Sequence, residues 1–365
     1  MPSKMRSLFG KLGLLLGGTV LGILAAESIA RTIAPHQSAD LLFNSSDASP
    51  MNLYVIDKQT RLRPNANLDT TIQSLDYTVK LRTNALGLRG PTVTSVTTEQ
   101  WIALGDSFTM SVQVNEEDSF AGLLGAEKNV HVWNGGVDGF STWQASLRLK
   151  QMAVKLPIKR AILTFFTGND FQDNERFPAM ARMRLPGQEG APIPRPSVGK
   201  MDLFLLQHSF LYAHYRIWNK QQQVQSGKDM SRGNWQDELR IFSTKGTKRL
   251  DQLEKKTTQA LLDFKNTCLK LNIEPLVAIA PPAFVIDQAR AKPTFELVGL
   301  DADTLNLDAP QIRVEKILSK LKIPSCTLTN ALRETDSNYL VFDGHWSKEG
   351  HRVAAKAISE CLEDQ

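Results

Sequence analysis

The sequence contains few cysteines and lacks the motifs that hold metals and nucleotides. Only three of its 365 residues are cysteine, and none belongs to a CxxC pair or a Cys/His cluster, which excludes the common zinc sites. The sequence has neither a GxxxxGK[ST] phosphate loop nor a glycine fingerprint for a dinucleotide. We therefore expect no cofactor and no metal. Four aspartates near the loops discussed below also lack EF-hand spacing: Asp106, Asp138, Asp170 and Asp173.

The cysteines themselves carry little information. Cys268 and Cys361 fall on apolar stripes of predicted helices, so both are expected in the core. A disulfide between Cys326 and Cys361 would be stable in an oxidising compartment, and the sequence leaves this pairing open.

Charge of one sign is not concentrated anywhere in the chain. The net charge is +5 and the sequence pI is about 9.0, but acidic and basic residues interleave. No Lys/Arg-rich segment alternates with aromatic residues, which argues against a nucleic-acid partner. With 42% hydrophobic and 22% charged residues, the chain has the composition of a globular protein with one large domain or two small ones.

The one long apolar run lies at the N-terminus. Residues 12–26 (LGLLLGGTVLGILAA) follow three basic residues, Lys4, Arg6 and Lys11. A basic start followed by an apolar run is typical of a signal anchor or a signal peptide. The run is shorter than the ~20 residues that span a bilayer, and its extension to residue 34 includes two charges.

Three interpretations of this N-terminus remain open. Residues 24–26 and 28–30 would serve as cleavage sites of a signal peptide. We favour an uncleaved signal anchor, a single transmembrane helix that holds the protein in the cell membrane with the rest extracytoplasmic. Cleavage would instead give a secreted or periplasmic protein. With either a signal anchor or a signal peptide, the basic residues before the apolar run stay on the cytoplasmic side of the membrane. A buried first helix of a cytosolic domain is the alternative that we favour least.

The rest of the chain divides into two parts. Residues 35–97 are predicted to be a linker and a small β lead-in that ends in residues 82–90 (RTNALGLRG). Residues 98–365 are predicted to be the catalytic domain, with an insertion at residues 171–245. Five prolines predict an irregular first half for this insertion, and the apolar run 201–218 predicts a helix. The insertion is expected either to cover the site as a lid or wall, or to form a peripheral subdomain.

Apolar strands and amphipathic helices alternate in the main domain. This alternation predicts an α/β fold with a parallel sheet that is covered by helices on both faces. The predicted strands are residues 101–104, 130–133, 161–166 and 276–280, and the predicted helices are residues 118–126, 141–155, 250–271, 308–321 and 347–362.

Four short segments carry the groups that acyl-transfer chemistry needs. Residues 105–108 (GDSF) directly follow a predicted strand, which would place the Ser107 hydroxyl at the carboxyl edge of the sheet as a nucleophile. His345 is the candidate base, and Asp343 is the acid that orients it. His351 is the competing base, and we expect it to be structural. Two loops complete the set, residues 134–139 (NGGVDG) and 167–170 (TGND).

This ordered set resembles the SGNH/GDSL hydrolase family. Residues 84–89 also resemble the Asn-x-x-Gly-[Leu/Phe]-Arg segment found upstream of the catalytic domain in many membrane-anchored members. The resemblance implies a three-layer α/β/α sandwich with a short, flavodoxin-like parallel sheet. It also implies an oxyanion hole formed by the backbone N–H groups of Ser107 and Gly139 and the side-chain amide of Asn169. The chain departs from the family where Phe342 occupies the usual aspartate position.

The function expected from this resemblance is that of a serine esterase. Ser107 would form an acyl-enzyme with an acyl ester, which we expect to be an acyl group on a cell-envelope glycan or lipid. An O-acyltransferase that modifies an extracellular polysaccharide is the alternative, with a cell-surface glycan as partner. A non-catalytic glycan-binding module is a third hypothesis. Such a module would not need Ser107, His345, Asp343 and Asn169 together.

Overall fold

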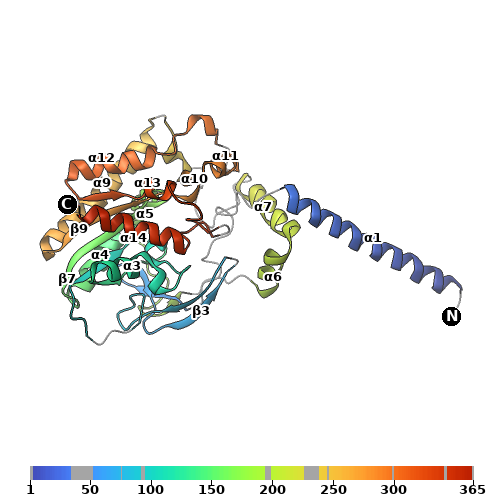
Figure 1. Ribbon diagram of the computed structural model, residues 1–365, viewed down its shortest axis with the longest axis horizontal. Helices are drawn as coiled ribbons and strands as arrows, with labels where there is room; N and C mark the ends of the chain where they lie inside the picture. The colour runs from blue at the N-terminus through green and yellow to red at the C-terminus, as the bar shows by residue number, and fades with distance from the viewer. Residues whose placement is uncertain are drawn as a thin grey trace.

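A computed structural model describes residues 3–33, 52–74, 76–91, 95–193, 199–225, 238–244, 246–297, 300–340 and 343–363. The predicted linker at residues 35–50 and Phe342 lie outside these ranges. The described chain is a mixed α/β body from which one N-terminal helix projects (Figure 1).

A five-stranded parallel sheet forms the centre of the body. Its strand order is β10-β9-β7-β5-β6, which is the order of flavodoxin-like sheets. The chain runs outward from β5 in both directions, so β5 and β7 flank the point where the strand order reverses. Ligands of such sheets bind at the carboxyl edge beside this point. The strands are β5 (Gln100–Leu104), β6 (His131–Asn134), β7 (Ile158–Phe166), β9 (Glu274–Ala280) and β10 (Ser325–Thr327).

Helices cover both faces of this sheet and give the predicted three-layer sandwich. Successive residues of a strand point to opposite faces. Accordingly, Ile102 and Leu104 lie in one apolar core, while Trp101 and Ala103 lie in the other. The first core is covered by α4 (Thr142–Ala153), α5 (Asp170–Met180), α9 (Lys248–Leu271) and α12 (Ala309–Leu321), and the second by α3 (Phe120–Lys128), α13 (Thr329–Arg333) and α14 (Lys348–Glu363).

One local prediction fails at the start of the insertion. Residues 170–180 form helix α5, although Pro178 predicted irregular structure there. Proline cannot donate a hydrogen bond to the carbonyl four residues earlier. The carbonyl of Asn174 instead accepts a hydrogen bond from the indole N–H of Trp143 at 3.1 Å. Burial of Phe171 and Phe177 further stabilises the helix against this loss.

The β lead-in packs against the loops at the carboxyl edge of the main sheet. Strands β1 (Tyr54–Asp57) and β2 (Arg61–Pro64) pair with each other, and β1 also pairs with β8 (Pro192–Ile193) from the insertion. Strands β3 (Asp69–Gln73) and β4 (Thr78–Arg82) form a separate hairpin. Side chains from both parts form a third apolar core, which includes Leu53, Tyr54, Ile72, Leu81, Met110, Val112, Val137 and Phe140.

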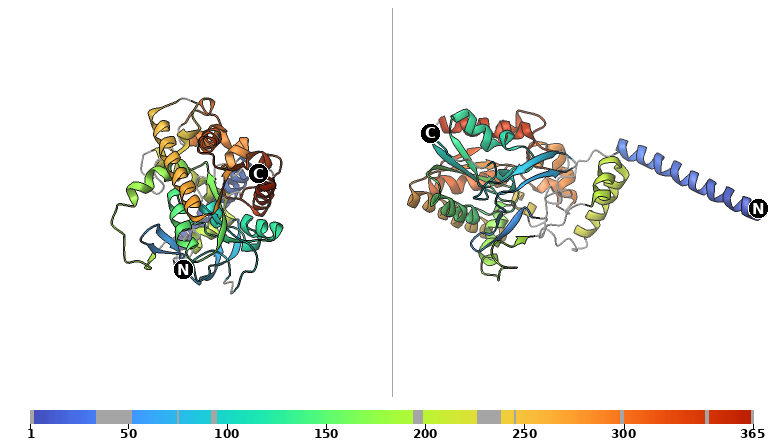
Figure 2. Two further views of the ribbon diagram at one scale, coloured as in Figure 1. Left: turned by 90° about the vertical axis from the view of Figure 1, so that its left-hand side faces the viewer. Right: turned by 90° about the horizontal axis from the view of Figure 1, so that it is seen from below.

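The N-terminal helix α1 (Ser3–Ile33) extends away from the body (Figures 1 and 2). The least favoured alternative, a buried first helix, is wrong, since the side chain of Leu14 is 82% exposed and most of the apolar residues that follow it are exposed too. By length and composition, residues Gly13–Thr32 are able to cross a membrane. The predicted helix at residues 201–218 is two helices, α6 (Lys200–His208) and α7 (Phe210–Gln225), separated at Ser209.

Candidate active site

The turn that carries Ser107 is fixed by its neighbours in the sequence. Gly105 has a φ of +144°, and a Cβ there would lie 2.5 Å from Thr109 Oγ1 and 2.8 Å from the carbonyl of Thr164. Only glycine fits this turn. Asp106 caps the short helix α2 (Ser107–Met110) by accepting a hydrogen bond from Phe108 N at 2.9 Å. Ser107 therefore begins α2 directly after β5, beside the point where the strand order reverses.

The structure brings the predicted base and acid to Ser107. His345 Nε2 lies 2.7 Å from Ser107 Oγ, and His345 Nδ1 lies 2.5 Å from Asp343 Oδ1. The side chain of Asp343 is fully buried, while that of His345 is 13% exposed. Hydroxyl, imidazole and carboxylate thus follow one another in the order of a serine triad.

Three residues that the sequence analysis did not identify hold Asp343. The backbone N–H of Asp343 donates to Asp76 Oδ2 at 2.8 Å. Tyr77 Oη donates to Asp343 Oδ2 at 3.4 Å, and Gln113 Nε2 donates to Oδ1 at 3.2 Å. Asp76 and Tyr77 lie between β3 and β4, more than 260 residues before Asp343, so no local pattern indicates this contact.

The electrostatic environment of His345 is set by two opposing effects. Burial by itself lowers the pKa of the imidazole, because it disfavours the charged form. The negative charge of Asp343 and its hydrogen bond more than offset this, so the pKa of His345 is raised above its usual value. The imidazolium that forms when His345 accepts a proton is thereby stabilised.

His351, the competing base, has a different environment. It is buried, its Nδ1 accepts a hydrogen bond from Phe120 N at 3.3 Å, and its ring stacks on Phe120 at 6.3 Å between centroids. Burial lowers its pKa to about 3, so the ring is neutral. His351 joins α14 to α3, and the Ser107 hydroxyl bonds to His345 instead.

The three predicted oxyanion donors follow adjacent strands. Ser107 follows β5, Gly139 follows β6 and Asn169 follows β7, and β5 pairs with both of the others in parallel. Their loops therefore meet at one edge of the sheet. The N–H groups of Ser107 and Gly139 and the side chain of Asn169 bond to no residue in the part of the chain that the structure describes. A Cβ at Gly139, whose φ is +69°, would have no described atom within 4 Å, so there is open space beside it.

Two buried carboxyl groups lie close behind the nucleophile. Asp170 Oδ2 accepts a hydrogen bond from Phe166 N at 2.8 Å, which caps the turn after β7. Burial raises the pKa of Asp106 to about 6, and burial and the charge of Asp106 raise the pKa of Asp170 well above its usual value. Asp106 Oδ2 and Asp170 Oδ1 have no hydrogen-bond partner among the described residues. Among these residues, no cluster of three metal-ligating side chains is found.

We expect Asp170→Asn to stabilise the protein increasingly as the pH rises. The pKa of Asp170 is raised in the folded state, so folding favours the protonated carboxyl group. The contribution of protonated Asp170 to the stability of the wild-type protein is therefore lost as the pH rises through the folded-state pKa. Asparagine keeps an acceptor for Phe166 N and does not ionise. The melting temperature of the variant, relative to wild type, should therefore increase between pH 4 and pH 8. The exposed Asp251→Asn is the control, and a difference that stays constant or falls with pH would contradict this assignment.

Arg89, from the lead-in segment that resembles the family, anchors the loop after α2. It is buried, and its Nη1 donates to the carbonyl of Met110 at 2.7 Å. Its guanidinium also donates to the carbonyls of Ser111 and Val114, and its Nε lies 3.0 Å from Glu116 Oε2. Arg89, a residue of the lead-in, thus fixes the backbone at the end of α2, the helix that begins with Ser107, and in the loop that follows.

No protein-family model and no curated protein sequence matches the chain. Solved structures are similar to it at low identity. A catalytic mutant of an acetylxylan esterase from Geobacillus stearothermophilus is 10% identical, with 74% of this chain and 96% of that chain covered and a TM-score of 0.39. A GDSL-like lipase from Bacteroides thetaiotaomicron is 10% identical, with 73% and 88% covered and a TM-score of 0.37. Because the sequence identities and TM-scores are low, only the geometry of this chain's own site carries information on its function.

Proposed function

We propose that this protein is a serine esterase of the SGNH/GDSL type. The continuous hydrogen-bonded path from Ser107 through His345 to Asp343 carries this proposal. A serine hydroxyl is a weak nucleophile at neutral pH and needs a base that can remove its proton. The position of Ser107 at the carboxyl edge of a flavodoxin-like sheet, with open space beside Gly139, supports the same reading.

The proposed reaction has two halves. Ser107 Oγ attacks the acyl carbonyl carbon, and His345 Nε2 accepts the hydroxyl proton. The negative charge that develops on the carbonyl oxygen is stabilised by the N–H groups of Ser107 and Gly139 and the amide of Asn169. His345 then donates its proton to the departing alcohol, which leaves an acyl-enzyme. A water molecule, deprotonated by His345, attacks this ester and releases the carboxylic acid.

We propose acyl groups on a cell-envelope glycan or lipid as the substrate class. The apolar segment Gly13–Thr32 of α1 follows the basic residues Lys4, Arg6 and Lys11, and this order supports a location of the body outside the cytoplasm. A fluorophosphonate probe tests the esterase proposal directly, since it reacts only with an activated serine. Labelling at Ser107 with hydrolysis of acetyl esters is the expected result, and absence of both would reject the proposal. Transfer of the acetyl group to an added glycan, in place of free acid, would favour the acyltransferase.

The pH dependence of the reaction should reflect the environment of His345. The base must be neutral to accept a proton, so kcat/KM should fall as the pH drops through its pKa. Because Asp343 raises this pKa, the acid limb should lie above the usual histidine value of about 6.5. Asp343→Asn should lower kcat by about 10⁴-fold. It should also move the acid limb to lower pH, and an unmoved limb would show that Asp343 does not set the pKa of the base.

A further inference from the structure

The end of α1 is joined by polar contacts to the pair of helices α6 and α7. We call this pair, which is connected through Ser209, the α6–α7 hairpin. The carboxylate of Glu27 accepts hydrogen bonds from Phe210 N at 2.8 Å, Leu211 N at 3.0 Å and Ser209 Oγ at 2.9 Å. The first N–H groups of a helix have no partner within the helix, and a carboxylate there is stabilised by the helix dipole. Glu27 of α1 is therefore the N-terminal cap of α7, although 182 residues separate it from Ser209.

Arg31 extends the same contact by one turn of α1. Its guanidinium pairs with Glu27 at 3.0 Å and donates to the carbonyl of His208 at 3.1 Å. It also lies 4.6 Å from the centre of the Phe210 ring. The two charges that interrupt the apolar sequence are thus both used in one junction, which we call the α1–α7 clamp. A cleaved signal peptide has no need of such a junction, so the clamp favours a retained α1.

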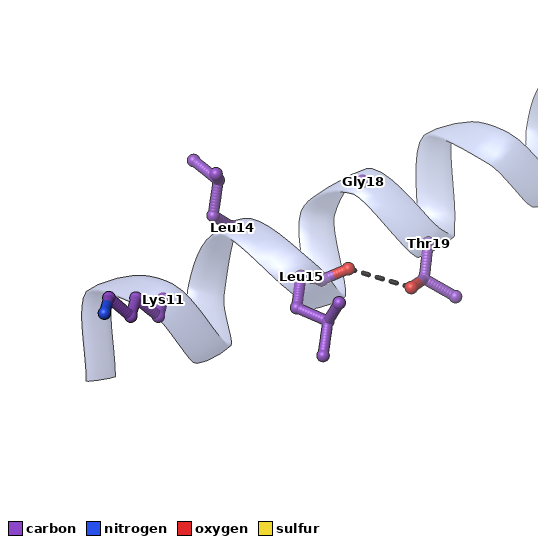
Figure 3. A pocket seen from close by; sticks show the side chains of 5 residues that line it. All are labelled: Lys11, Leu14, Leu15, Gly18 and Thr19. Carbon is purple, nitrogen blue, oxygen red and sulfur yellow. Dashed lines mark hydrogen bonds between the residues drawn. The ribbon is translucent and has the colours of Figure 1, made fainter. Parts of the chain in front are cut away.

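The segment Gly13–Thr32 of α1 is largely exposed and apolar, and its hydroxyl groups are hydrogen-bonded within the helix. Figure 3 shows Thr19, whose Oγ1 donates to the carbonyl of Leu15 at 2.8 Å. Ser28 and Thr32 donate in the same way to Leu24 and Ile29. Internal satisfaction of this kind is what a hydrocarbon environment demands.

The α6–α7 hairpin also has an apolar, aromatic surface. Four of its large side chains are each more than half exposed: Met201, Phe204, Tyr215 and Trp218. The hairpin itself is held together by Arg216, which pairs with Asp202 at 2.5 Å, so these side chains belong to an ordered element. Tyrosine and tryptophan are enriched where a bilayer meets water, because one end of each ring is apolar and the other polar.

We propose that the α6–α7 hairpin rests in the headgroup region of the lipid bilayer that α1 crosses, with Phe204, Tyr215 and Trp218 in contact with lipid. The clamp supports a position of the hairpin in the headgroup region, because Glu27 lies only five residues before the end of the Gly13–Thr32 span. Five residues correspond to a distance of about 8 Å along a helix. The inference concerns attachment alone and does not depend on the esterase activity.

This arrangement also sets how the body faces the membrane. The C-terminus lies at the end of the body opposite α1, and α14 runs along the body (Figures 1 and 2). The end of α14 that follows His345 therefore faces α1. The helices α10 (Ala283–Ile286) and α11 (Gln288–Leu297), which follow the carboxyl end of β9, lie on the side nearest α7 (Figure 1). The carboxyl edge of the sheet is thus directed toward the bilayer.

Spin labelling of the full-length chain in vesicles tests the proposal. The vesicles contain phosphatidylcholine and phosphatidylglycerol, and Trp218→Cys carries the label in a chain with Cys361→Ser. Cys268 and Cys326 are buried and remain. We expect the label to collide several-fold more often with dissolved oxygen, relative to a water-soluble nickel chelate, than a label at Leu269→Cys. Leu269 is 61% exposed on α9, shortly before β9 begins at the amino edge of the sheet, away from the bilayer.

Three results would overturn the proposal. Equal collision ratios at the two positions would place the hairpin in water. Protection of the label from both reagents, with spin–spin broadening, would show a second copy of the chain on the hairpin instead of lipid. A mature chain that begins after residue 26 or 30, measured by mass spectrometry, would show that α1 is removed.

A second variant tests the clamp. Glu27→Ala removes the cap of α7, so the collision ratio at position 218 should fall toward the value at position 269. Hydrolysis of a soluble acetyl ester should stay unchanged, since Glu27 takes no part in the active site. Membrane insertion is checked by resistance to alkaline extraction. An inserted variant whose ratio matches that of the parent protein would show that the clamp does not hold the hairpin at the bilayer.

Discussion

Ser107→Ala is expected to reduce kcat for ester hydrolysis by about 10⁶-fold, as loss of the nucleophile does in a serine protease. The reason is that the base then has no hydroxyl to deprotonate and no acyl-enzyme forms. The oxyanion donors remain, so a residual rate above that of water is expected. The measurement is initial-rate kinetics with acetyl esters, together with fluorophosphonate labelling, which should disappear.

The fold should tolerate this change. Among the described residues, the hydroxyl hydrogen-bonds to the side chain of His345 alone, and the turn depends on Gly105 and Asp106 instead. The melting temperature of Ser107→Ala should therefore stay close to that of wild type. Ser319→Ala, which removes an exposed hydroxyl on α12, is the matched control and should keep full activity. A Ser107→Ala variant with wild-type esterase activity would contradict the proposal that Ser107 is the nucleophile.

Arg89→Ala is expected to destabilise the protein by about 3–5 kcal/mol, the usual cost of removing one partner of a buried ion pair. The variant removes the guanidinium donor from the backbone carbonyls of Met110, Ser111 and Val114, of which that of Ser111 keeps a bond from Val114 N. Since these carbonyls lie at the end of α2 and in the loop that follows, kcat should fall as well. Chemical denaturation and ester hydrolysis measure the two effects.

Two variants make the test of Arg89 specific. Arg82→Ala removes an exposed guanidinium at the end of β4 in the same lead-in, and we expect it to change neither stability nor activity. Arg89→Lys keeps the charge but loses the planar fork that reaches several carbonyls, so it should restore stability only in part. An Arg89→Ala variant with wild-type stability would show that the lead-in does not support the loop.

The sequence predicted the features that depend on local patterns. Continuous apolar runs identified β5, β7 and β9, because strands covered on both faces contain few polar residues. The helix predicted at residues 141–155 is α4, and the side chain of Ser141 caps it together with that of Gln144. The placement of Ser107, His345 and Asp343 at one edge of the sheet follows from the same pattern of strands and loops.

The features that the sequence analysis missed depend on contacts between distant segments. Strand β10 (Ser325–Thr327) is short and contains two polar residues, and it is held by pairing with β9. The α1–α7 clamp joins residues 27 and 210, and neither residue alone suggests the other. Helix α5 was missed because Pro178 was given more weight than the buried Phe171 and Phe177, which stabilise the helix.

The contact between Asp76 and Asp343 has a consequence for the synthesis of the protein. The hairpin of β3 and β4 leaves the ribosome first, and its partner Asp343 follows 267 residues later. At ~5–20 residues per second, this interval is on the order of tens of seconds. Until then neither the acid, Asp343, nor the base, His345, has been made. If α1 directs the chain across the membrane during synthesis, the growing chain has no esterase activity until nearly all of it has been made.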